Sequence, residues 1–116
     1  MGYTTKFQGS FTITPSLTAQ QVAVLTEFSE TRHEDAEFPS IWCDWCPSVN
    51  GTSLAWNQSE KTYETCAWIK YLIEHFFNPW GCTLNGHVRW QGEVVGDAGI
   101  ITVIDNVLTT KVFDNG

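Results

Sequence analysis

The sequence contains no run of about eighteen apolar residues, the length that a membrane-spanning helix requires. It also lacks a charged segment followed by an apolar one at its start, which is the pattern of a secretory signal. We therefore expect a cytoplasmic protein that neither spans a membrane nor binds one.

Basic residues are scarce in this chain. The 116 residues include 6 Lys and Arg against 13 Asp and Glu, so the formal net charge at pH 7 is −7. An acidic protein of this kind repels the phosphate backbone of nucleic acids. The composition therefore argues against direct binding of DNA or RNA.

Motifs that fix a chemistry are missing as well. We find no nucleophile elbow, no glycine-rich phosphate loop and no histidine metal motif. The most suggestive cluster is His33-Glu34-Asp35, but such a charge run is usually a solvated loop. We name no catalytic residue and expect no cofactor, and an enzyme with an unrecognised site remains an alternative.

Four cysteines are present, and Cys43 and Cys46 have the C-x-x-C spacing of metal and redox sites. No second closely spaced pair follows, and Cys66 falls on the apolar side of a predicted helix. In a strand, positions 43 and 46 point to opposite faces. We interpret the thiols as structural and predict no metal site, with a metal, a redox pair or a disulfide as open alternatives.

Aromatic residues are abundant by contrast: 6 Trp, 7 Phe and 3 Tyr make up 14% of the chain. Trp42 and Trp45 are three apart in a predicted strand, so both cannot face the core. On the predicted helix, Trp68 lies roughly 100° around the axis from Ile69. We therefore expect aromatic side chains on the surface, where they favour a partner interface or a ligand slot, and a wide helix face half covered by loops is the open alternative.

Apolar periodicity and capping motifs predict the secondary structure in the first half of the chain. Residues 3–13 alternate as a half-buried strand does, and Thr18 with Gln21 forms a capping box that starts a helix at about Ala19. Residues 41–46 and 52–56 predict two short antiparallel strands.

The main core element is predicted to follow. Asn57 and Glu60 suggest the N-terminal cap of a long helix that ends at Asn78-Pro79. Its apolar stripe repeats every three or four residues, at Cys66, Ile69, Ile73, Phe76 and Trp80.

Three strands complete the prediction, at residues 83–93, 99–104 and 107–113, the last two joined by the two-residue turn Asp105-Asn106. The order is β-α-β-β-α-β-β-β. It predicts one α+β domain over residues 1–116, with an antiparallel sheet of about five to six strands and both helices on one face.

Several short motifs span nearly the whole chain. They are Trp56 with Glu60-Lys61 and Tyr63, Pro79-Trp80-Gly81, Leu84-Asn85-Gly86, residues 90–93 (WQGE) and Asp105-Asn106. In these motifs the chain resembles a family of small, uncharacterised acidic proteins of bacteria and their phages. The resemblance implies a mobile-element setting in a bacterial host cell and brings no established activity.

The chain departs from that family pattern in two respects. Cys46 and Cys82 stand where an apolar residue and a tyrosine are more usual, which further disfavours a metal site. The segment from His33 to Ser40 is shorter than in other members, so any site on their longer insert is missing here.

The leading hypothesis is a non-enzymatic binding protein, a phage or mobile-element accessory factor that docks on a host protein such as a defence component. The net charge and the surplus of rings motivate it. The candidate partner-binding residues are Glu34, Asp35, Glu37, Asp44, Trp45, Trp68 and Glu93.

The alternative is a protein that sequesters a small molecule or nucleotide in a slot between the long helix and the sheet. The candidate residues are Trp42, Trp56, Tyr63 and Trp90, with Arg89 and Gln91 for polar contacts.

Overall fold

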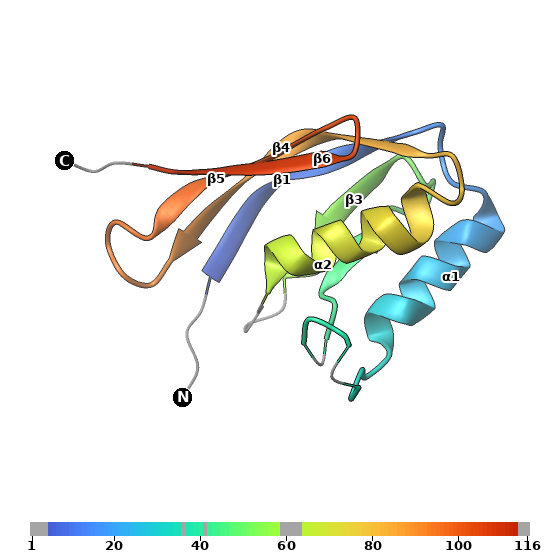
Figure 1. Cartoon of the computed structure of the whole chain (residues 1–116), viewed down its shortest axis with the longest axis horizontal. Coiled ribbons are helices and arrows are strands. Elements are labelled where there is room, and N and C mark those ends of the chain that lie inside the picture. The colour runs from blue at the N-terminus through green and yellow to red at the C-terminus, as the bar shows by residue number, and fades with distance from the viewer. Residues whose placement is uncertain (1–4, 36, 41, 59–63, 114–116) are drawn as a thin grey trace.

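The computed structural model describes residues 5–35, 37–40, 42–58 and 64–113 (Figure 1). The elements, in chain order, are β1 (Thr5–Thr14), α1 (Ala19–Glu30), β2 (Trp45–Pro47), β3 (Ser53–Trp56), α2 (Thr65–Leu72), the π-helical segment η1 (Ile73–Phe77), β4 (Thr83–Gly92), β5 (Ala98–Ile104) and β6 (Val107–Val112). The predicted α+β class and element order are confirmed.

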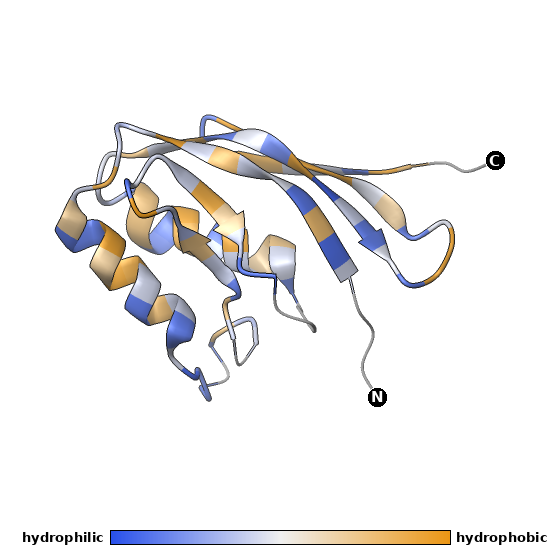
Figure 2. Ribbon diagram, turned by 180° about the vertical axis from the view of Figure 1, so that it is seen from behind, coloured by the Kyte–Doolittle hydropathy of each residue, from blue (hydrophilic) through white to orange (hydrophobic). Residues whose placement is uncertain are grey.

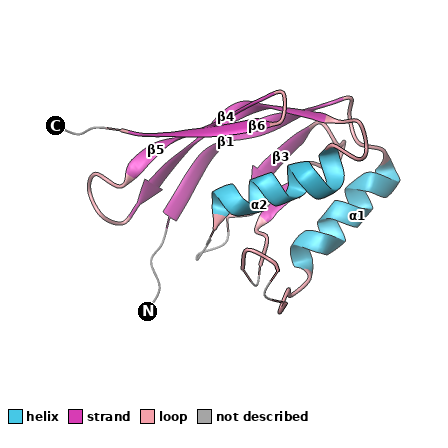
Figure 3. Cartoon of the chain, in the orientation of Figure 1, coloured by secondary structure: helices cyan, strands magenta, loops and turns pink. Residues whose placement is uncertain are grey.

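The strands form one antiparallel sheet of six strands in the order β2-β3-β1-β4-β5-β6. Both helices lie on the same side of this sheet, as predicted (Figures 1 and 3). No helix of the described residues lies on the opposite face of the sheet. Within the described ranges, no helix has the length and apolarity needed to cross a membrane.

Alternation along β1 decides which side chains reach the core. Phe11 and Ile13 are 0% and 2% exposed, whereas Ser10 and Thr12 are exposed on the other face. This is the period of two that a half-buried strand shows, and the ribbon colours in Figure 2 follow it. The predicted strand is therefore confirmed over the residues that are described.

Helix α1 begins where its cap predicts. The Thr18 hydroxyl accepts a hydrogen bond from the Gln21 amide at 3.1 Å, and the Gln21 side chain accepts one from the Thr18 amide at 2.9 Å. This reciprocal capping box satisfies two amides that a helix start leaves unpaired.

The predicted start of the long helix is wrong. Asn57 and Gln58 are not helical, and α2 begins at Thr65, after Glu64 in a left-handed conformation (φ 56°). The Asn57 amide instead donates to the Asp44 carbonyl at 3.0 Å, which ties it to the start of β2. A second positive φ at Gln58 (66°) interrupts any right-handed helix there. Glu60 lies outside the described residues.

The last turn after α2 changes which side chains are buried. The Asn78 amide donates to the Ile73 carbonyl, five residues earlier, at 2.8 Å, so the last turn is π-helical. The wider turn places Phe77 on the sheet side at 0% exposure, while the predicted Phe76 is only partly buried. Trp68 and Leu72, at 0% and 1% exposure, widen the predicted stripe.

The turn between β5 and β6 is held by Asn106. Asp105 and Asn106 both have positive φ (49° and 69°), as a two-residue hairpin turn of type I′ requires. The Asn106 side chain accepts from the Leu84 amide at 2.6 Å and donates to the Asn78 side chain at 2.7 Å. It therefore joins the hairpin to both β4 and the end of η1.

The approach of Trp90 to β5 gives a stability prediction. A Cβ added at Gly99 would overlap Cη2 of Trp90 and lie 2.5 Å from the Lys111 carbonyl oxygen. We expect Gly99→Ala to lower the free energy of unfolding by about 3 kcal/mol through overpacking. Urea unfolding followed by tryptophan fluorescence measures the loss.

Gly81→Ala is the matched control. An added Cβ there meets nothing within 4 Å, and only the positive φ of 72° opposes it. We expect a loss of about 1 kcal/mol from that conformation. Equal losses for the two variants would contradict the packing of Trp90 against Gly99.

Candidate functional site

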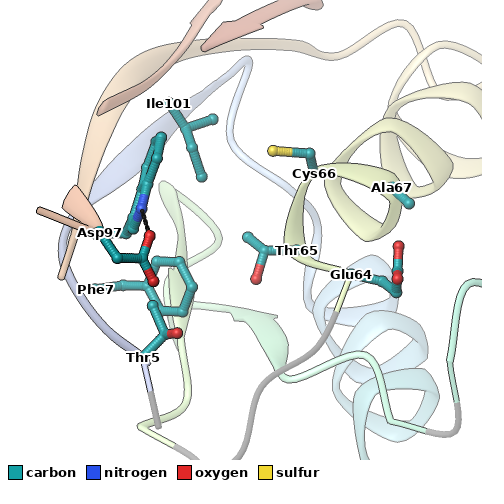
Figure 4. Close-up of a pocket in the computed structure, with 9 residues that line it drawn as sticks. Thr5, Phe7, Glu64, Thr65, Cys66, Ala67, Asp97 and Ile101 are labelled. Atoms are coloured by element: carbon teal, nitrogen blue, oxygen red, sulfur yellow. Dashed lines mark hydrogen bonds between the residues drawn. The ribbon is translucent and has the colours of Figure 1, made fainter. Parts of the chain in front are cut away.

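A pocket of about 360 Å³ lies between the start of α2 and the sheet (Figure 4). The sheet side is formed by Thr5, Phe7, Trp90, Asp97 and Ile101. The helix side is formed by Glu64, Thr65, Cys66 and Ala67. We call this pocket the slot. It lies on the covered face of the sheet, where a ligand slot was predicted.

Trp90 and Asp97 form the fixed part of the sheet wall. The Trp90 indole N–H donates to Oδ1 of Asp97 at 3.1 Å, the dashed line in Figure 4. The Asp97 backbone is held too, because its amide donates to the Val94 carbonyl at 3.0 Å and its carbonyl accepts from the Gly92 amide at 2.8 Å. The carboxylate therefore has a defined position at the slot.

The ring of Phe7 is positioned by its neighbours. It makes edge contacts with Trp45 and Trp56, at centroid distances of 5.4 Å and 5.3 Å. Aromatic pairs prefer this geometry, so the ring is held before any ligand arrives. Phe7 and Trp90 together give the slot two aromatic side chains.

The charged side chains among the described lining residues of the slot are of one sign. The ionisable carboxylates that line it are Glu64 and Asp97, and the described lining residues include no Lys, Arg or His. Glu64 directly precedes α2, where a carboxylate offsets the partial positive charge of the helix start. Carboxylates beside aromatic rings are the groups that attract an organic cation.

Cys66 brings a thiol to the slot. Burial raises its pKa above the ordinary value, and nearby Lys70 offsets this in part. Burial also raises the pKa of Cys46 and Cys82, and that of Cys43 to about 12. All four thiols are free, and each is mainly protonated at neutral pH, which makes it a poor nucleophile.

A metal ion has no evident cage in the described ranges: no group of three His, Cys, Asp or Glu side chains there could hold one. Cys43 is fully buried beside β2, and its thiol donates to the Trp45 carbonyl at 3.5 Å. At least one thiol of the C-x-x-C pair therefore lies in the core.

The predicted slot residues are only partly brought together. Trp90 lines the slot and Trp56 supports it through Phe7. Arg89 and Gln91 are exposed on the opposite face, because the neighbours of an inward residue in a strand point outward. Their predicted role as polar contacts in the slot is therefore wrong. Trp42 is 45% exposed and is not among the lining residues, and Tyr63 lies outside the described residues.

Two predicted partner-binding rings are in the core. Trp68 is 0% exposed, because α1 and described residues after it cover it: its ring packs against Phe28 and Phe38, and its N–H donates to the Ser40 hydroxyl at 2.7 Å. Trp45 is 1% exposed. The prediction that both are surface side chains is wrong.

Asp44 is 6% exposed, so its predicted place on an acidic surface is wrong too. The other predicted partner residues, Glu34, Asp35, Glu37 and Glu93, are exposed. Trp42 and Trp45 do not both face the core, as predicted, since Trp42 is exposed and Trp45 is buried, but strand alternation is not the reason. Residues 42–44 precede β2, and Asp44 between the two rings has a positive φ of 63°.

His33, the best catalytic candidate in the sequence, is 8% exposed. Its ring lies between Phe28 and Phe38, at centroid distances of 4.3 Å and 4.5 Å, and Nε2 is 3.0 Å from the Phe28 carbonyl oxygen. This arrangement anchors the segment after α1 to the aromatic core.

Sequence reasoning missed Phe7 and Asp97 as slot residues. The alternation of β1 places Phe7 inward, which is a usable signal, but nothing local marks Asp97. No family model matches the chain, and comparisons with curated proteins and with solved structures found no match either.

The thiols provide a test of this geometry. We expect iodoacetamide to leave Cys43 unmodified in the folded protein and to modify Cys46 and Cys66 more slowly than free cysteine at pH 8. A raised pKa lowers the thiolate fraction at that pH, so the rates should rise as the pH increases above 9. Mass spectrometry of digested peptides measures each site.

The urea-unfolded protein is the control, in which all four cysteines should react at similar rates. Rapid modification of Cys43 in the folded protein would contradict its burial.

Proposed function

We propose that this chain is a small-molecule-binding protein whose slot takes a compact organic cation, such as an amine with an apolar or aromatic body. The observation that carries the proposal is the Asp97 carboxylate, held by the Trp90 N–H beside the rings of Phe7 and Trp90. A cation over an aromatic face near a carboxylate gains from both.

The dimensions support a small ligand. About 360 Å³ lies at the lower end of the range typical of ligand sites, roughly 300 to 1,000 Å³. The walls come from α2 and three strands, and the rings are held by neighbours before binding. Little ordering free energy is then lost when a ligand enters.

The negative charge of the slot favours some classes of ligand over others. A nucleotide, which the sequence left open, brings phosphates toward Glu64 and Asp97, where like charges repel. Docking on a host protein in a phage setting is the other hypothesis. Of its predicted binding residues, Glu34, Asp35 and Glu37 are exposed, but Trp45 and Trp68 are buried in the core. We therefore place the cation-binding slot first.

Matched ligand pairs test the proposal. Choline and its neutral isostere 3,3-dimethylbutan-1-ol differ in charge but little in shape, as do tryptamine and indole-3-ethanol. We expect calorimetry to show at least one cation binding about tenfold more tightly than its neutral partner, because only the cation gains the charge terms. The melting temperature of the protein should rise with that cation and not with its neutral partner.

Asp97→Asn removes the charge and keeps an oxygen that accepts the Trp90 N–H. We expect it to weaken the cation about tenfold and to leave the neutral partner unchanged. Glu74→Gln, an exposed carboxylate on η1 outside the slot, is the control and should change neither. The bound cation should also slow alkylation of Cys66 relative to Cys46.

Flat melting curves for all four ligands would overturn the proposal. So would equal binding of each cation and its neutral partner, or a loss in Glu74→Gln as large as that in Asp97→Asn.

A further inference from the structure

The sheet has one face that no helix covers, on the side away from the slot (Figures 1 and 3). Residues opposite one another in an antiparallel pair point to the same face, so the register identifies the outward side chains. We call this surface the open face. Across β1, β4, β5 and β6 it includes Lys6, Gln8, Ser10, His87, Arg89, Gln91, Ile100, Thr102, Thr109 and Lys111.

The charge of the open face is opposite to that of the whole protein. The six described strands contain no Asp or Glu. Three of the chain's six Lys and Arg residues, Lys6, Arg89 and Lys111, lie on this face, and all three are exposed. The carboxylates of the described residues are on the helices and in the loops. The open face is therefore positively charged although the net charge of the whole chain is −7.

The cations lie close together. One row of the register runs Gln8, Arg89, Ile100 and Lys111, which places Arg89 and Lys111 two strands apart, roughly 10 Å. Lys6 is opposite Gln91 in the row beyond Arg89.

These cations have no acidic partner in the described part of the chain. The salt bridge recorded there joins Arg32 and Glu34, after α1. Arg89 instead lies over the Phe113 ring, 5.9 Å from its centroid, which keeps the guanidinium on the sheet surface. The positive charge is thus available to a partner.

Apolar side chains share the open face with the cations, and the main pair lies four residues, roughly 13 Å, along the strands from the row that holds Arg89 and Lys111. Ile104 and Val107 are paired across β5 and β6 on the same face, and they are 62% and 64% exposed. Ile100 adds a partly exposed side chain beside Arg89. A mixture of apolar and charged groups on a broad surface is typical of protein interfaces.

We infer that the open face docks an acidic surface of another protein, through Lys6, Arg89 and Lys111 and the apolar pair Ile104 and Val107. Charge complementarity supplies the selectivity and the apolar pair supplies buried area. A single-stranded nucleic acid fits less well. Its bases stack best on exposed aromatic side chains, and the outward positions of the four strands carry no Phe, Tyr or Trp. The Phe113 ring just beyond β6 is only partly exposed and has Arg89 over it.

Titration of the ¹⁵N-labelled protein tests the inference with three probes: a peptide rich in Glu and Leu, the same peptide with Lys in place of Glu, and oligo-dT of equal length. We expect the acidic peptide alone to shift amide signals, and to shift those of β1, β4, β5 and β6. The shifts should vanish in about 1 M salt, where screening acts over ~3 Å.

Two double variants with equal charge change separate the surfaces. Arg89→Gln with Lys111→Gln should weaken the acidic peptide about fivefold to tenfold. Arg32→Gln with Lys70→Gln, on the helical side, should change it less than twofold. Asp97→Asn should also leave it unchanged, so failure here is distinguishable from failure of the slot. Each variant must keep the amide spectrum of a folded protein.

Four results would overturn the inference. They are oligo-dT binding as strong as that of the acidic peptide, no signal shift with the acidic peptide, shifts confined to the helices, and concentration-dependent self-association that accounts for the shifts.

Discussion

The burial of α2 against the sheet is the constraint on which the rest of the structure depends. Ile69 and Phe77 are fully buried on the sheet side, and Trp68 is enclosed on the other side by α1 and the segment that follows it. The Trp68 N–H has its hydrogen bond to Ser40, so enclosing the indole leaves no unpaired donor there. Helix α2 is therefore held on two sides, and its first turn has one position relative to the strands.

That position creates the slot and separates two surfaces of opposite charge. The start of α2 stands beside β1, β4 and β5, so Thr65 and Cys66 face a wall that contains Trp90 and Asp97 (Figure 4). The strands themselves are free of carboxylates, and Arg89 points away from the helices. An anionic slot and a cationic open face thus lie on the two sides of one sheet, and this separation of charge is why we propose a different kind of partner for each.

Local patterns predicted much of the fold. The capping box at Thr18, the alternation of β1 and the turn at Asn106 depend on near neighbours, so the sequence carries them directly. The predicted start of α2 was wrong because Gln58, which would be its first residue, has a positive φ of 66°, and a backbone hydrogen bond ties Asn57 to Asp44 instead. Of the candidate site, Trp90 was predicted, whereas Arg89 and Gln91 were placed in the slot without regard to strand alternation.

The sequence by itself determined the periodicities, the total charge and the number of rings, because each is a property of the chain's covalent order. Only the tertiary structure decided which rings are enclosed and which charges share a face. Trp68 lies beside the predicted stripe in any helix, but α1 and described residues after it must fold over it before it is buried. Likewise Arg89 and Lys111 are far apart in sequence, and strand pairing brings them into one row.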